Sequence, residues 1–110
     1  MNLTIKPLES FKKDVKKLHK KYKNIPKDLK KLQEELLQNP KAGIQLGLHC
    51  YKIRLANSSI PTGKSSGFRV VYYFLDEFGV IYLMSMYSKS DLENISDEEI
   101  LHILKQNGLF

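Results

Sequence analysis

Cysteine and arginine are scarce in this chain, and long apolar runs are missing. Cys50 is the only cysteine among 110 residues, so no disulfide can form within the chain. No apolar stretch approaches the roughly 20 residues that a membrane-spanning helix needs. Residues 1–20 lack the apolar core of a signal peptide, because lysines follow Phe11 closely. We therefore expect a cytoplasmic protein, and the length predicts one domain spanning residues 1–110.

Positive charge is abundant, but lysine supplies nearly all of it. The formal net charge is +6, and only Arg54 and Arg69 are arginines. Residues 91–110 contain five acids against one lysine, so residues 1–90 carry a net charge of +10. A basic body of this kind favours polyanionic partners such as nucleic acids. The alternative interpretation is a lysine-rich surface that is simply solvated.

The two halves of the chain differ in their apolar periodicity. The first half repeats apolar residues every three or four positions, as amphipathic helices do, and the second half shows β-branched and aromatic strand runs. The resulting order is β-α-α-β-β-β-α, which defines an α+β fold. The expected elements are a strand at 2–6, a helix with its stripe at Phe11, Val15, Leu18 and Tyr22, a second helix with its stripe at Leu29, Leu32 and Leu36, strands at 49–55, 68–75 and 80–87, and a last helix opened by the capping box at 96–99.

The two arginines lie on successive predicted strands. In the first of these strands, Lys52 and Arg54 alternate with apolar neighbours and so point to one face of the sheet. In the next strand, Arg69 interrupts a run of apolar and aromatic residues. Because arginine is a rigid, bidentate phosphate binder, this placement predicts an anion site on a sheet face.

Three short motifs, in this order, resemble the RelE/ParE superfamily of toxins from type II toxin–antitoxin systems. They are Cys-Tyr-Lys-Ile-Arg-Leu at 50–55, Gly-Phe-Arg-Val-Val-Tyr at 67–72 and Tyr-Leu-Met-Ser-Met-Tyr-Ser-Lys at 82–89. They look most similar to the RelE and HigB branches. The resemblance implies a RelE-like, microbial-ribonuclease-type fold with a small, mainly antiparallel sheet and an N-terminal helical hairpin. It also implies a ribosome-dependent mRNA endoribonuclease (an mRNA interferase) that inhibits translation and is silenced by a cognate antitoxin.

The resemblance assigns the catalytic residues position by position. The basic residues of the family's second strand match Lys52 and Arg54, and the arginine of the following strand matches Arg69. A basic residue after the last strand falls on Lys89, and Tyr87 is a nearby tyrosine that could serve the same site. The C-terminal tyrosine of the best-known RelE pattern has no counterpart here. Proton transfer is therefore expected from Tyr87 or Lys89, with no metal and no cofactor.

Further lysines are candidates for contact with RNA. Lys64 lies in the long loop between two strands, and Lys16 and Lys20 belong to a lysine-rich helical face. Contact with the backbone of ribosomal RNA and simple solvation explain that face equally well. Two other functions stay open: a ParE-like toxin that inhibits DNA gyrase, and a noncatalytic RNA-binding relic of the family. The clustered strand cations favour the endoribonuclease over the gyrase inhibitor.

Overall fold

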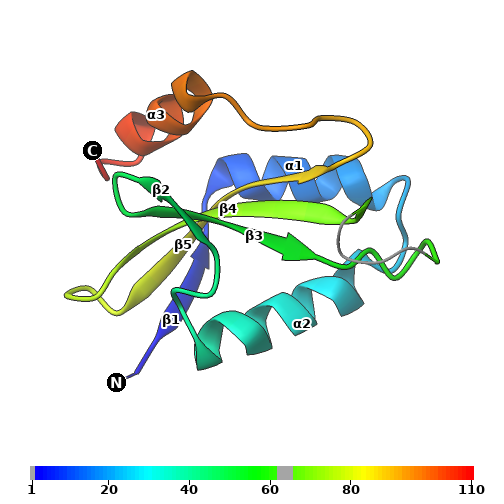
Figure 1. Cartoon of the computed structure of the whole chain (residues 1–110), viewed down its shortest axis with the longest axis horizontal. Coiled ribbons are helices and arrows are strands. Elements are labelled where there is room, and N and C mark those ends of the chain that lie inside the picture. The colour runs from blue at the N-terminus through cyan, green and yellow to red at the C-terminus, as the bar shows by residue number, and fades with distance from the viewer. Residues whose placement is uncertain (1, 62–65) are drawn as a thin grey trace.

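The computed structural model describes residues 2–61 and 66–110 and confirms an α+β fold (Figure 1). A five-stranded sheet forms its centre, and helices pack on both faces. The expected helices and strands are all present, with ends that differ by a few residues from the predicted ones. In chain order the elements are β1 (Thr4–Pro7), α1 (Glu9–His19), α2 (Ile25–Gln38), β2 (Ile44–Gly47), β3 (Cys50–Leu55), β4 (Phe68–Leu75), β5 (Val80–Ser88) and α3 (Asp97–Gln106).

The sheet is mainly antiparallel, as expected. Its strand order is β1-β5-β4-β3-β2. Only the pair β1 and β5 runs parallel, and the other three pairs are antiparallel. The two strands that carry the arginines, β3 and β4, are therefore neighbours near the middle of the sheet, and β5 lies on the other side of β4.

The edge strand β2 was not predicted, so the structure has one strand more than the predicted order. All four residues of β2 are exposed, and the strand therefore lacks the alternation that marks a half-buried strand. The hairpin turn to β3 also gives no sequence signal. Leu48 and His49 both have positive φ values, 53° and 65°, in a turn that usually selects Asn or Gly. His49 thus lies in this turn and does not open β3.

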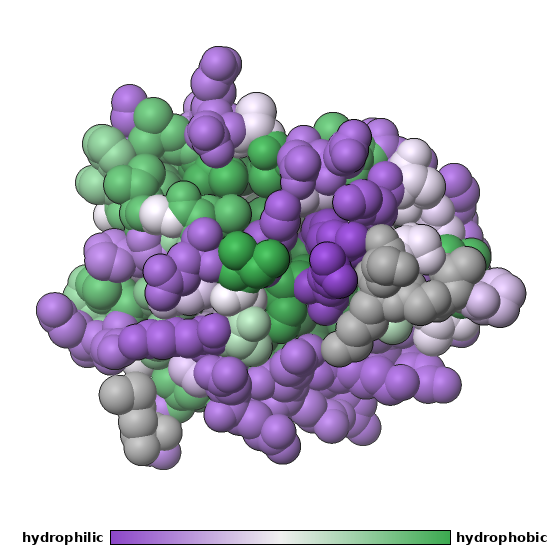
Figure 2. Space-filling view, viewed as in Figure 1, coloured by the Kyte–Doolittle hydropathy of each residue, from purple (hydrophilic) through white to green (hydrophobic). Residues whose placement is uncertain are grey.

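The helices divide between the two faces of the sheet. On one face, Phe11 of α1 and Leu32 and Leu36 of α2 pack with the inward residues of β3, β4 and β5. On the other face, α3 packs against Val71 and Met84. In Figure 2, apolar side chains gather at the upper left, where α3 and the C-terminus lie, and hydrophilic side chains line the lower edge along α2. None of the helices in the described ranges is long and apolar enough to cross a bilayer.

The capping box at the start of α3 forms as expected. The side-chain oxygen of Ser96 accepts a hydrogen bond from the backbone N–H of Glu99 at 3.1 Å. This bond satisfies one of the N–H groups that a helix start leaves without a partner. It fixes the point at which the chain, after leaving β5, turns onto the sheet face that carries Arg69.

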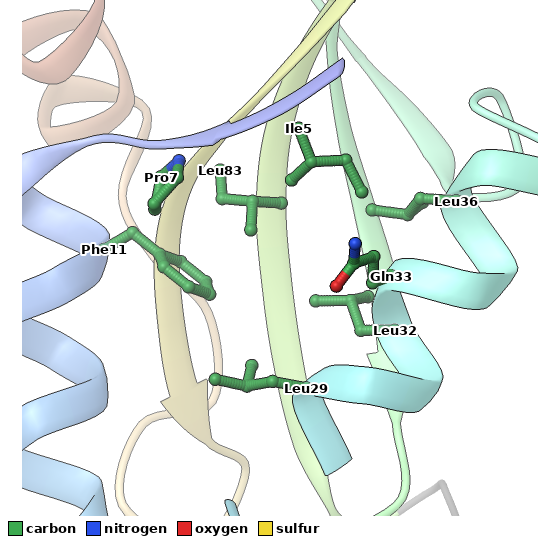
Figure 3. Close-up of a pocket in the computed structure, with 8 residues that line it drawn as sticks. All are labelled: Ile5, Pro7, Phe11, Leu29, Leu32, Gln33, Leu36 and Leu83. Carbon is green, nitrogen blue, oxygen red and sulfur yellow. The ribbon is translucent and has the colours of Figure 1, made fainter. Parts of the chain in front are cut away.

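An apolar groove of about 230 Å³ separates α1 from α2 (Figure 3). Phe11 and Pro7 border it on one side, and Leu29 and Leu32 border it on the other. Its lining contains no titratable side chain, so it offers no acid, base or charge for chemistry. It lies on the face of the sheet that α1 and α2 cover, opposite the face that carries Arg54 and Arg69.

Candidate functional site

Arg54, Arg69 and Tyr87 form a row across three neighbouring strands. Arg54 of β3 lies opposite Arg69 of β4, and Arg69 lies opposite Tyr87 of β5. Side chains directly opposite each other on antiparallel strands share one face, with Cβ atoms about 4.5–5.5 Å apart. The flanking residues Ile53 and Leu55 point to the opposite face, into the core beneath α1 and α2. We call these three residues the basic row; they lie on the face that α3 partly covers.

Lys52 joins the same face one step along β3. It lies two residues before Arg54 and opposite Val71, which packs under α3. Its Nζ donates a hydrogen bond to Oδ1 of Asn94 at 2.8 Å. Asn94 belongs to the segment between β5 and α3, so this bond ties that segment to the sheet beside the basic row. No sequence motif marks Asn94, because its role depends on the path that the chain takes after β5.

Arg69 lies deep in the face. Its side chain is only 5% exposed, and Nη1 donates to the carbonyl oxygen of Phe68 at 3.1 Å. Burial lowers the pKa of the Arg69 guanidinium, and the positive charge of Arg54 lowers this pKa further. Two like charges directly opposite each other destabilise a ladder. An anion bound between them would relieve that repulsion.

Tyr87 completes the row at its β5 end. The residue is 7% exposed, and its buried hydroxyl forms no hydrogen bond of normal geometry within the described ranges. Burial raises the pKa of Tyr87, while the backbone of Ile95 and the charge of Arg69 oppose that shift. The phenol therefore stays protonated at neutral pH. It can donate a proton or a hydrogen bond, but it cannot act as a base.

The remaining predicted site residues are not members of the row. Lys89 is exposed and lies one residue beyond β5, where its backbone N–H donates to the carbonyl of Gly67 at 3.0 Å. Lys16 and Lys20 are exposed on and just after α1, in the helical layer on the other face of the sheet. Lys64 lies outside the described residues.

The site offers cations and a neutral phenol as its chemical groups. Within the described ranges, no three His, Cys, Asp or Glu side chains come together in a way that could hold a metal ion. Cys50 is buried, and burial raises the pKa of its thiol to about 11, so it is no activated nucleophile. What the row can do is bind an oxyanion, stabilise negative charge that develops on it, and supply a proton from Tyr87.

The fold and this basic face define the chain as a toxin of the RelE/ParE superfamily, from a type II toxin–antitoxin system. Residues 5–106 match the model of the ParE toxin of the type II toxin–antitoxin system parDE, and the chain belongs to that family.

Two solved structures of the E. coli toxin RelE are similar over most of their length. A double arginine-to-alanine mutant of RelE in the free state is 26% identical, with a TM-score of 0.61, over 96% of this chain and 98% of that one. The toxin in the intact E. coli RelBE toxin–antitoxin complex is 29% identical, with a TM-score of 0.58, over 78% of this chain and 95% of that one. The family model thus carries the ParE name, whereas these solved structures are of RelE.

Proposed function

We propose that this toxin is a ribosome-dependent mRNA endoribonuclease that cleaves without a metal ion. The observation that carries the proposal is the basic row, in which two arginines and a protonated tyrosine lie in register on one sheet face. Such a row matches the needs of phosphodiester cleavage, which are cations where charge develops and a proton for the leaving oxygen.

In the proposed reaction, the ribose 2′-OH attacks the adjacent phosphorus. The new P–O2′ bond forms as the bond to the 5′-oxygen breaks, which leaves a cyclic phosphate on one fragment and a 5′-OH on the other. Arg54 is exposed and receives the phosphate first, and Arg69 lies deeper. Because Arg69 is almost fully buried, its contact with the phosphate requires a covering segment to shift when substrate binds.

The protonation states of the site residues determine which of them can donate a proton to the leaving oxygen. Tyr87, whose pKa is raised by burial, donates its proton to the departing 5′-oxygen. Lys52 and Arg54 lower the pKa of the attacking 2′-OH by their positive charge, so its proton passes to solvent water as the P–O2′ bond forms. Solvent then returns a proton to Tyr87 after the 5′-OH has left. Lys89, at the exposed end of β5, is the alternative proton donor.

Ribosome binding is assigned to the lysines of the helical layer. Lys16 and Lys20 lie on the opposite side of the sheet from the basic row, so they can contact ribosomal RNA while the row faces mRNA. Contacts of this kind position a protein without reading sequence. Lys64 is assigned the same role from its place in the sequence.

A cognate antitoxin is the expected protein partner, since one of the similar structures is of RelE in its complex with the antitoxin. An acidic and apolar antitoxin segment laid over the basic row would neutralise Arg54 and block access to Arg69. Hydrogen exchange of residues 50–55 and 67–73, with and without the partner, tests this arrangement. Unchanged exchange in both segments, together with protection elsewhere, would mean that the antitoxin acts by another route.

The match to the ParE family model favours a second candidate, inhibition of DNA gyrase. Two assays, one of mRNA cleavage and one of DNA supercoiling, distinguish these functions. The endoribonuclease cuts translated mRNA and loses that activity in Arg69→Ala, whereas a gyrase inhibitor leaves mRNA intact and blocks supercoiling by purified gyrase. A chain that does neither, yet still binds RNA, would be a noncatalytic relic.

A further inference from the structure

A second cavity lies beside the Tyr87 end of the basic row. Its volume is about 370 Å³, within the range of small-molecule sites. It forms because β1 pairs only with residues 80–83 of β5, so the remainder of β5 has no strand on that side and α1 runs alongside it instead. The lining residues are Asp14, Lys17, Leu18 and Lys21 from α1 and its end, Met86, Tyr87 and Ser88 from β5, and Asp91 and Leu92 beyond it.

Hydrogen bonds hold two walls of this cavity in place. Oδ2 of Asp14 accepts bonds from the Ser85 hydroxyl and from the Met86 backbone N–H, each at 3.0 Å. On the other side, the carbonyl of Ser88 accepts the backbone N–H groups of Asp91 and Leu92, each at 3.0 Å. Because both walls are tied to β5, the cavity is preformed and does not depend on a ligand for its shape.

The lining combines three kinds of surface. Lys17 and Lys21 are exposed cations four residues apart on the α1 side. Leu18, Met86 and Leu92 supply apolar surface, and Leu92 keeps 45% of its surface exposed. Two carboxylates also line the cavity: Oδ2 of Asp14 already accepts two bonds from β5, whereas Asp91 is exposed and offers a hydrogen-bond acceptor.

These surfaces match the parts of one nucleotide. Its phosphate suits the lysines, the flat face of its base suits the apolar side chains, and the N–H donors on its base edge suit a carboxylate. The position of the cavity gives the second argument. Tyr87 lines the cavity and also lies opposite Arg69, so the cavity lies beside one end of the basic row, at the free edge of β5.

We propose that this cavity holds the nucleotide next to the scissile phosphate and so sets a base preference at that one position. This inference rests on the proposed RNA cleavage. The basic row would act on any phosphodiester, because it contacts only the backbone. The cavity would select among the sites that the ribosome presents, because it encloses a base.

The test uses the full chain with two cavity variants, Leu92→Glu and the double variant Lys17→Gln/Lys21→Gln. All three side chains are exposed, so the fold should tolerate these changes, and thermal unfolding verifies it. The charge-matched control is Lys6→Gln/Lys105→Gln, which removes two exposed lysines remote from the cavity. Cleavage sites on translated mRNA are mapped for each variant over many codons.

The cavity variants should raise the KM for mRNA about tenfold and alter the base distribution at one position beside the cut. The control should keep both the KM and the distribution, and Arg69→Ala should lose cleavage at all sites. If the cavity variants cut with unchanged KM and unchanged base distribution while Arg69→Ala is inactive, the proposed function stands and this inference is overturned.

If the wild type cuts no mRNA, a binding assay with RNA tests the nucleotide site independently of the proposed cleavage. The probe is then a set of single-stranded 2′-O-methyl hexanucleotides, followed by fluorescence anisotropy. Weaker binding by the cavity variants than by the control would support the nucleotide site in a noncatalytic protein. Equal binding, or a loss of antitoxin affinity with RNA binding unchanged, would overturn it, the latter in favour of a protein ligand.

Discussion

Arg54 and Arg69 lie directly opposite each other on antiparallel strands, with one exposed to solvent and the other almost fully buried. A ladder pair of like charges is unfavourable, and burial makes the inner charge more costly still. The repulsion also lowers the pKa of Arg69. Repulsion within such a pair is a local instability, which an anion bound beside the pair would offset.

This instability predicts an opposite effect of one substitution on stability and on activity. Arg54→Gln should raise the free energy of unfolding by a few tenths of a kcal/mol, because it removes the repulsion of Arg69. The same variant should cleave mRNA more slowly. Urea denaturation measures the stability, with Lys30→Gln as the control for loss of an exposed lysine charge. A destabilised Arg54→Gln protein would show that the pair is not under electrostatic strain.

The substitution Tyr87→Phe removes only the phenolic hydroxyl and therefore tests the role of that group alone. The hydroxyl is buried and forms no hydrogen bond of normal geometry within the described ranges, so its removal should leave the free energy of unfolding unchanged or slightly higher. Cleavage should fall about a hundredfold or more if the phenol protonates the leaving oxygen. Melting temperature and single-turnover cleavage measure the two effects. An unchanged cleavage rate would transfer the proton-donor role to Lys89.

Asp14 connects α1 to β5 through two hydrogen bonds, so its replacement should lower the free energy of unfolding. Asp14→Ala removes the acceptor of two hydrogen bonds and leaves the Met86 N–H without its partner, which should cost about 1–3 kcal/mol. Asp91→Ala is the matched control, because Asp91 is exposed and substitution of such a residue usually changes stability by less than about 0.5 kcal/mol. If both variants lose the same free energy of unfolding in denaturant, the hydrogen bonds of Asp14 do not stabilise the packing of α1 on β5.

The buried thiol of Cys50 predicts a loss of stability in alkali. Its pKa rises from 9.0 to about 11 on folding, so the unfolded chain releases the proton first as the pH rises. The stability that the thiol contributes is complete below pH 9 and is lost as the pH approaches 11, by about 2–3 kcal/mol in total. Cys50→Ala should show a shallower decline of the unfolding free energy between pH 9 and 10.5. A slope equal to that of the wild type would contradict this assignment.

The sequence predicts the basic row well because a strand places alternate residues on one face. Arg54 and Arg69 each lie in a clear strand pattern, and neighbouring strands with a common face bring them together. The depth of Arg69 could not be predicted, since it depends on which segment covers that face. The partner of Lys52 was missed for the same reason, because Asn94 comes from an irregular segment.

The hairpin of β2 and the cavity beside Tyr87 escaped prediction for different reasons. The hairpin turn uses Leu48 and His49 at positive φ, where sequence rules expect Asn or Gly. The cavity depends on β1 ending its pairing at Leu83, which leaves the rest of β5 beside α1. That end point is a property of the assembled sheet and has no local signature.

The most direct test of the account compares wild type, Arg69→Ala and Arg69→Lys in a purified translation system with one defined mRNA. Wild type should cut the mRNA only when ribosomes translate it. Arg69→Ala should lose cleavage by at least a hundredfold while its circular dichroism spectrum and ribosome co-sedimentation stay unchanged, and Arg69→Lys should recover only a small part, because lysine lacks the bidentate fork. Cleavage by a folded Arg69→Ala protein at the wild-type rate would contradict the account.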